Sequence, residues 1–402
     1  MPAGVRLGRA CPLARRRPWP QIRPHTAGWL AAGALAAGLV SGCSGSTPPG
    51  NLISVSTGTC GTGWQQVTTG MQTFQVRNSS TGGAEVDLID PADGAVYAEV
   101  EALGPGTTRP MGVDVGSGRY AFRCLIEDTD AITGPTVRVP GHVKGAPAIL
   151  PVTTDDLLAP ASEYHAYVTA GLSTLAGQTD ALAAAVQSGD LAAARTAWLA
   201  AHLTYERLGA AYGTFGNYDT QIDGRPDGLP GGVTSAQFTG FYRVEYGLWH
   251  GQRAGELAGP AGQLDRDVRA LQAAFPAMEV DLLDIGLRTH EILENALEFQ
   301  LTGHDDYGSG TTLATTQANI QGTLELLKVL HPLLAARYRQ LPAVYTWLDR
   351  LSSLIAAAQR PGGSWTPVGE LGTYRREQID AAASQALEEL APIAVITEPR
   401  RT

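Results

Sequence analysis

Two glutamates in the C-terminal half, Glu206 and Glu245, fall on the apolar faces of predicted helices. At about 100° per residue, Glu206 shares one side of its helix with Trp198, His202 and Tyr205. Glu245 shares a side with a second apolar and aromatic group, which consists of Phe241, Tyr242, Leu248 and Trp249. A buried carboxylate without a partner is costly, so each glutamate must meet a cation, a proton or a metal ion. A helical domain that gathers carboxylates inward is typical of an ion site.

The first 42 residues have the pattern of a bacterial lipoprotein signal peptide. They contain six arginines and no acidic residue, and an uncharged, largely apolar run spans residues 27–40. That run is too short to span a bilayer comfortably. It ends in Val40-Ser41-Gly42-Cys43, which resembles a lipobox. By that resemblance Cys43 would be lipidated and become the mature N-terminus; the alternative is a signal anchor that is never cleaved.

The charge of the mature chain argues against nucleic acid as a partner. The whole chain has 29 Lys and Arg and 39 Asp and Glu. Without the six arginines of residues 1–42, 23 basic residues remain against 39 acidic ones, so the mature net charge is near −16 with His neutral. Such a chain repels polyanions and favours cations.

Residues 52–143 contain short alternating runs that are separated by turn residues. This spacing predicts a small β-sandwich, which looks cupredoxin-like. The preceding residues 43–51 are rich in Ser, Gly and Pro and predict a tether. The following residues 144–160 contain three prolines and predict a linker.

Two cysteines, Cys60 and Cys124, fall in the predicted β-sandwich. Export into an oxidising compartment favours a disulfide between them. The alternative is a metal site, with copper as the candidate metal and Glu85 as a third candidate ligand. No His lies between Cys43 and Gly141, so this domain cannot build a His₂Cys copper centre from its own residues.

Residues 161–396 are rich in Ala and Leu with helical periodicity and predict an antiparallel helical bundle. The expected helices span residues 163–188, 191–215, 239–250, 264–274, 281–302, 311–334, 342–358 and 375–391. Tight Gly and Pro breaks, such as residues 224–228 and 361–363, fit loops between them. The predicted fold class is therefore multidomain, with a β-sandwich followed by a helical bundle.

A set of short motifs in the bundle carries a family resemblance. They are His202, Tyr205-Glu206-Arg207, Gly224-Arg225-Pro226, Phe238-Thr239-Gly240-Phe241, Glu245-Tyr246-Gly247-Leu248-Trp249, His290-Glu291 with Glu294, and Leu301-Thr302-Gly303. Together they resemble the imelysin-like "peptidase" domain of EfeO iron-uptake components. The likeness covers essentially the whole mature chain, including the order of the two domains. One position departs from it: the family signature is Gly-x-His-x-x-Glu, and here Tyr242 stands in place of the His.

The resemblance implies an extracytoplasmic iron-binding protein, held as a lipoprotein in the periplasm or at the outer face of the cell membrane. It further implies a membrane iron permease and a haem peroxidase-like protein as partners in the same uptake system. Hard oxygen donors suit Fe³⁺, and the candidate ligands are Glu206, Glu245, Tyr242, His202, Asp219 and Glu294.

Several of these assignments stay open at the level of sequence. His202, one turn before Glu206, would either ligate the metal or orient the glutamate. Asp219 lies in a predicted loop, and Glu294 could equally form a surface pair with His290. Tyr242 replaces a softer donor by a phenol, which as phenolate suits Fe³⁺.

Other functional classes compete with iron binding. The chain has no His-Glu-x-x-His motif and no Ser or Cys nucleophile beside a recognisable His, so we predict that it is not a peptidase despite the domain label. The remaining alternative is a structural or polyanion-binding adaptor with a degenerate metal site. The missing signature His keeps that alternative open, although the acidic charge weighs against polyanions.

Overall fold

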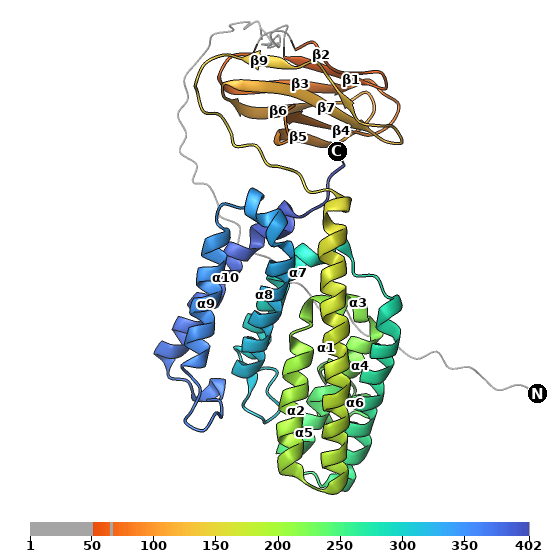
Figure 1. Cartoon of the computed structure of the whole chain (residues 1–402), viewed down its shortest axis with the longest axis vertical. Coiled ribbons are helices and arrows are strands. Elements are labelled where there is room, and N and C mark those ends of the chain that lie inside the picture. Colours follow the sequence, from red (N-terminus) through yellow and green to blue (C-terminus); the bar gives the residue numbers. More distant parts are fainter. Residues whose placement is uncertain (1–50, 65–66, 402) are drawn as a thin grey trace, which may run out of the picture. The chain divides into compact units, whose positions relative to one another are not determined.

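The computed structural model describes residues 51–64 and 67–401, and its N-terminal domain is a β-sandwich (Figure 1). The predicted signal peptide and the lipidation site Cys43 lie outside the described residues. One sheet has the strand order β2-β1-β3-β6, and the other has the order β5-β4-β7-β8 with β9 also paired to β7. Its strands are β1 (Leu52–Ser56), β2 (Thr59–Thr62), β3 (Gly70–Asn78), β4 (Ala84–Ile89), β5 (Val96–Leu103), β6 (Thr108–Val115), β7 (Gly118–Ile126), β8 (Ile132–Thr133) and β9 (Val137–Val139).

The sandwich core comes from alternate residues of facing strands, as the period of two predicts. Phe74 of β3 and Phe122 of β7 are fully buried, and Trp64 packs edge-on against both rings. A disulfide joins Cys60 of β2 to Cys124 of β7. Of the two roles open to these cysteines, the structure contains the disulfide, which leaves neither thiol free to bind copper.

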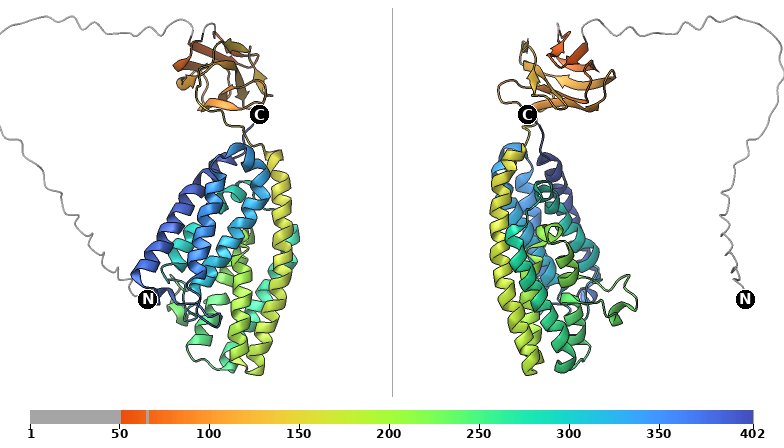
Figure 2. Two further views of the ribbon diagram at one scale, coloured as in Figure 1. Left: turned by 60° about the vertical axis from the view of Figure 1, so that its left-hand side comes forward. Right: turned by 90° about the vertical axis from the view of Figure 1, so that its right-hand side faces the viewer.

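The C-terminal domain is helical, which confirms the predicted fold class of a β-domain followed by a helical bundle. Its α-helices are α1 (Thr154–Ser188), α2 (Leu191–Glu206), α3 (Tyr212–Phe215), α4 (Asn217–Asp223), α5 (Gly240–Trp249), α6 (Ala254–Ala274), α7 (Leu282–Asn295), α8 (Thr312–Arg337), α9 (Leu341–Ala356) and α10 (Thr373–Ile396). Shorter helical turns are η1 (Gly209–Ala211), η2 (Gly232–Thr234), η3 (Phe275–Ala277), η4 (Ala296–Gln300) and η5 (Val368–Glu370). Long helices α1, α2 and α6 run side by side, as do α7, α8, α9 and α10 (Figure 2).

The predicted linker, residues 144–160, is shorter than expected because α1 already begins at Thr154. Thr153 caps this helix: its hydroxyl accepts a hydrogen bond from the N–H of Asp156, whose carboxylate accepts one from the N–H of Thr153. This capping box fixes the start of the helix. Pro160 lies inside α1 and removes one backbone hydrogen bond without ending the helix.

A second difference concerns residues 217–223, which form the helix α4 although the sequence predicts a loop there. Two glycines bracket this helix, Gly216 with a positive φ of 57° and Gly224. In the same way α6 begins ten residues earlier than expected, at Ala254, with Pro260 inside it. The helix α4 and the first ten residues of α6 were missed because Gly and Pro nearby read as breaks.

Within the described residues, none of the helices combines the length and the apolar composition that a bilayer crossing requires.

Candidate metal centre

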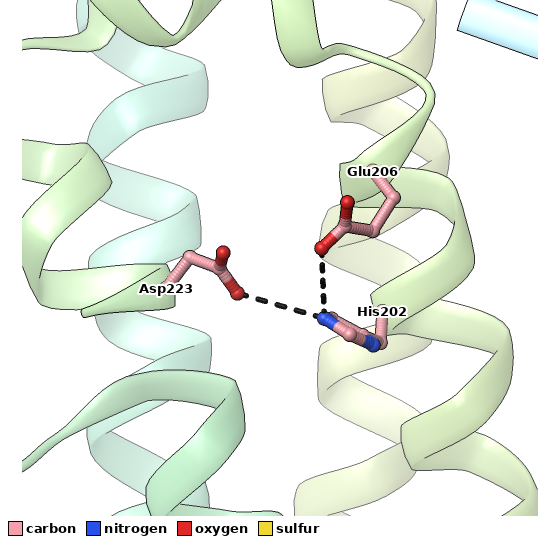
Figure 3. A group of neighbouring side chains, drawn as sticks. All are labelled: His202, Glu206 and Asp223. Carbon is pink, nitrogen blue, oxygen red and sulfur yellow. Dashed lines mark ion pairs between the residues drawn. The ribbon is translucent and has the colours of Figure 1, made fainter. Parts of the chain in front are cut away.

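Three ionisable side chains converge inside the helical bundle (Figure 3). His202 Nε2 lies 3.0 Å from Glu206 Oε1 and 3.6 Å from Asp223 Oδ1. One donor atom from each of the three residues lies within 4.8 Å of the others. His202 and Glu206 are 2% and 3% exposed, so the group is withdrawn from bulk water. We call His202, Glu206 and Asp223 the triad.

The triad is assembled from two helices. His202 and Glu206 are four residues apart on α2 and therefore lie on one face. Asp223 is the last residue of α4, which runs beside the start of α5. At that crossing Gly240 has a φ of 80°, and a Cβ there would lie 2.2 Å from the carbonyl oxygen of Ile222. Only glycine permits this approach, which fixes the end of α4 and hence Asp223.

The triad leaves buried polar atoms without hydrogen bonds. Neither ring nitrogen of His202 has a hydrogen-bond partner, and neither does Asp223 Oδ1. Nε2 is close to both carboxylates, but its orientation is not that of a hydrogen bond to either. Buried polar groups normally have partners. Two carboxylates and an imidazole that point at a common space fit the donor set of a metal cation.

The electrostatics of the triad favour positive charge. Burial alone would lower the pKa of His202, but the carboxylates of Asp223 and Glu206 outweigh it and raise that pKa to about 10. Burial, together with the negative charge of Glu206, holds the pKa of the Asp223 carboxyl well above its usual range, against the opposing effect of His202. Both shifts favour the protonated forms of His202 and Asp223 in the metal-free protein, and a bound cation would replace such a proton.

The triad borders a cavity of about 530 Å³, which has further polar groups in its wall. The Tyr242 hydroxyl donates a hydrogen bond to Asp305 Oδ2 at 3.3 Å, and Arg225 Nη1 lies 3.4 Å from the same oxygen. Burial and the nearby carboxylate of Asp223 keep the pKa of Tyr242 well above its ordinary value. In the metal-free state Tyr242 is therefore a neutral phenol next to an acceptor, Asp305, that already holds its hydrogen bond.

The structure brings together some of the ligands that the sequence predicts. Glu206 and His202 are in the triad. Tyr242 and Asp219 line the same cavity, and the ring of Tyr242 packs edge-on against His202. Asp219 accepts a hydrogen bond of 2.6 Å from the Tyr205 hydroxyl.

Two predicted ligands lie elsewhere. Glu245 is buried, but its Oε1 accepts hydrogen bonds from the backbone N–H groups of Tyr307 and Ser309, at 3.1 and 3.0 Å. Burial raises its pKa to about 7. The side chain of Glu294 is 59% exposed and lies 3.6 Å from His290, as a surface pair on α7. Glu245 Oε1 and the Glu294 carboxylate thus have partners outside the triad, whereas Glu245 Oε2 is buried without a hydrogen-bond partner.

Asp223 is the ligand candidate that sequence reasoning missed. It follows Asp219 by four residues, so both acids lie on one face of a single helix turn. That spacing is visible in the sequence, but it indicates a shared face only if residues 217–223 are helical. Gly216 and Gly224 flank the segment and favour a loop, so the sequence does not indicate that it is helical.

In the β-domain, Glu85 lies on β4 and is not joined to a metal-type cluster, since the triad is the one group of that kind in the described residues. Burial, with the neighbouring charges of Asp87 and Glu101, raises the pKa of Glu85.

Comparison with known proteins assigns the helical domain to a family. Residues 160–393, more than half of the chain, match the model of the imelysin family, which also carries the label peptidase M75. The chain is 29% identical over 270 residues to the iron uptake system component EfeO of Yersinia pestis, which covers 67% of this chain and 70% of that protein. It is 26% identical over 335 residues to EfeO of Escherichia coli O157:H7, with 81% and 86% covered. These matches confirm the resemblance inferred from the motifs, and the chain belongs to the imelysin family.

Proposed function

We propose that this protein is an extracytoplasmic iron-binding component of an iron-uptake system. The observation that carries the proposal is the triad: a buried imidazole and two carboxylates that converge without hydrogen bonds among them. The relatives in Yersinia pestis and Escherichia coli are named as components of an iron uptake system, and these names support iron as the bound metal.

The donor set favours Fe³⁺ over softer ions. Glu206 and Asp223 offer hard oxygen atoms, and only His202 is of intermediate softness. Tyr242 adds a phenol at the cavity wall, and Asp305 accepts its hydrogen bond. A trivalent cation would displace the phenol proton toward Asp305, so Tyr242 becomes a further hard donor in place of the family's His.

Binding and transfer follow from the charges in the cavity. His202 and Asp223 hold a proton in the metal-free state, and the incoming cation releases it. We further propose that the iron passes to a membrane iron permease and that a haem peroxidase-like protein belongs to the same system. A lipid on Cys43 would keep the protein at the membrane, and mass spectrometry of the mature N-terminus tests this directly.

The protein is further proposed to act without peptidase activity. The triad combines one His with two carboxylates, and no Ser or Cys nucleophile is part of it. Incubation of the metal-loaded protein with unfolded casein should leave the casein intact; cleavage that disappears in Glu206→Gln would instead assign an enzyme.

The central test is iron binding by the protein from Ser44 onward, which lacks the predicted signal peptide and the lipidation site. The metal-free protein is titrated with Fe³⁺ in competition with a chelator, and metal content is then measured after gel filtration. We expect about one iron held by the wild type and strong loss in Glu206→Gln. Glu294→Gln is the matched control, because it makes the same substitution at an exposed glutamate.

Two results would contradict the proposal. If the wild type takes up no iron, the adaptor alternative with a degenerate site replaces it. If Glu294→Gln loses as much iron as Glu206→Gln, the metal does not bind at the triad.

A further inference from the structure

A second and larger cavity shares the helices α4 and α5 with the triad cavity. Its volume is about 830 Å³, within the usual range for small-molecule sites. Helix α4 contributes Gln221 to this cavity and Asp223 to the other. Helix α5 contributes Arg243 and Tyr246 here and Tyr242 to the triad side. These two helices therefore contribute side chains to the walls of both cavities, and their course is shown in Figure 1.

Arg243 is a guanidinium in the wall without an acidic partner. Its Nη1 donates a hydrogen bond of 3.0 Å to Gln252 Oε1, and no carboxylate of the described residues pairs with it. The side chain is half-buried, and this burial lowers its pKa. Guanidinium groups carry five N–H donors in a planar fork that matches a carboxylate. An unpaired fork of this kind favours an anion in the cavity.

Asp267, on α6, contributes a hydrogen-bond acceptor to the same cavity. The residue is 9% exposed, and its Oδ1 accepts a hydrogen bond of 2.7 Å from Gln263 Nε2. Its Oδ2 is buried without a partner. A buried carboxylate oxygen requires a donor, and hydroxyl groups of a ligand would supply it.

The rest of the lining is uncharged and mixes polar with apolar residues. It includes amide and hydroxyl side chains from three segments, among them Gln221, Thr234, Ser235 and Gln252. Gly247 makes room for the Arg243–Gln252 pair, because a Cβ there would lie 2.4 Å from Gln252 Oε1 and 3.1 Å from Arg243 Nη1. The position of the guanidinium is thus built into α5.

From these groups we infer a second binding site, for a small polyhydroxylated carboxylate of the sugar-acid class. The carboxylate of the ligand lies against Arg243, and a hydroxyl donates to Asp267 Oδ2. The remaining hydroxyls meet the amides and hydroxyls of the wall. This inference does not depend on iron binding at the triad.

The test compares two probes of equal chain length, D-gluconate and hexanoate, by isothermal titration calorimetry on the metal-free protein from Ser44 onward. Both carry one carboxylate, but only gluconate has hydroxyls. The wild type should bind gluconate more tightly than hexanoate. Arg243→Gln should weaken gluconate binding by about tenfold or more, because a charged hydrogen-bond donor is lost. Arg243→Lys keeps the charge but not the planar fork, so its affinity for gluconate should lie between those of the wild type and Arg243→Gln.

Asp267→Asn tests the second contact separately. It should reduce the preference for gluconate over hexanoate severalfold and leave hexanoate binding unchanged. Glu206→Gln, in the lining of the other cavity, is the control and should bind gluconate like the wild type. Circular dichroism and the melting temperature establish that each variant is folded.

The inference is overturned if the wild type shows no preference for gluconate, or if folded Arg243→Gln binds it unchanged. It is also overturned if Glu206→Gln abolishes gluconate binding, because the ligand would then occupy the triad cavity. None of these results depends on whether iron binds.

Discussion

His202 Nε2 lies 3.6 Å from Asp223 Oδ1, although the two residues come from different helices and are separated by two glycine-containing turns. The short helix α4, which ends at Asp223, holds this carboxylate at that distance. The first prediction follows from that relationship. Asp223→Asn should weaken Fe³⁺ binding by at least about tenfold, since even outer partners of metal ligands contribute about 10-fold to 100-fold. Competition titration against a chelator measures the change.

Asp219→Asn is the matched control for this prediction. Asp219 is on the same helix and lines the same cavity, but it accepts the hydroxyl of Tyr205. An amide oxygen retains that hydrogen bond, so the loss should be smaller than in Asp223→Asn. Equal losses would mean that Asp219 is a ligand as well.

The second prediction concerns pH. The pKa of His202 is raised to about 10, so its ring is protonated at neutral pH and must lose that proton to coordinate metal. Iron binding should therefore release at least one proton at pH 6, and affinity should rise with pH. Calorimetry in two buffers of different ionisation enthalpy counts the protons. His202→Gln should release at least one fewer; an equal count would show that His202 does not coordinate.

The same shift predicts the stability of the metal-free protein. The folded pKa of His202 lies above its ordinary value of 6.5, so its stabilising effect is complete below pH 6.5 and is lost as the pH rises toward 10. Urea unfolding of the helical domain should therefore show falling stability over that range. His202→Gln should flatten the pH dependence, and an unchanged slope would contradict this account.

The third prediction concerns Tyr242. If its phenolate binds Fe³⁺, iron addition should produce a visible charge-transfer band, and Tyr242→Phe should abolish the band. The fold should survive, because the variant loses only the hydroxyl and its hydrogen bond to Asp305. Absorption spectra of the loaded proteins decide the matter. Unchanged colour in Tyr242→Phe would reduce Tyr242 to a packing residue beside His202.

The fourth prediction concerns Glu245 as an anchor of the loop that follows η4. Its carboxylate accepts the N–H groups of Tyr307 and Ser309 and so fixes the loop before α8. Glu245→Ala should destabilise the helical domain by about 2 kcal/mol or more, since hydrogen bonds to a charged group are lost. Hydrogen exchange at residues 307 and 309 should accelerate. Glu245→Gln retains a carbonyl acceptor and should show a smaller effect; protected amides in Glu245→Ala would contradict the anchor role.

The fifth prediction concerns the β-sandwich. The disulfide between Cys60 and Cys124 closes a loop with a sequence separation of 64 residues. Reduction, or the double substitution to Ser, should cost on the order of 4 kcal/mol of stability. Peptide mapping without reductant checks the bond, and two free thiols in the denatured, unreduced protein would refute it. Iron binding at the triad should not change in the double variant.

The sequence predicts the domain order because alternation and helical period run through long segments. It also selects Glu206 and His202, because both lie on the face of α2 that carries Trp198 and Tyr205. It does not reveal α4, whose seven residues lie between glycines and include weak helix formers such as Asn217 and Asp219. Asp223 was missed with that helix.

Glu245 shows a different limit. The helical face correctly predicts that this carboxylate is buried, but it does not say which group meets it. Its partners are backbone N–H groups 62 and 64 residues further along the chain, and no pattern within α5 indicates them. Glu294 lies beside apolar residues of its helix, and such a position is compatible with a buried or an exposed side chain. The structure places this side chain in solvent.

Helix α5 contributes residues to both cavities, so the register of this helix is unusually important. Tyr242 and Arg243 are consecutive and line different cavities, while Glu245 holds a loop. A one-residue deletion directly after Gly240 would rotate the following residues by about 100° and place Arg243 at the position of Tyr242. That single event would turn a cation toward the triad and remove the anchor of the loop at once. Length changes in this ten-residue helix should therefore be far less tolerated than point substitutions, even conservative ones at its buried positions.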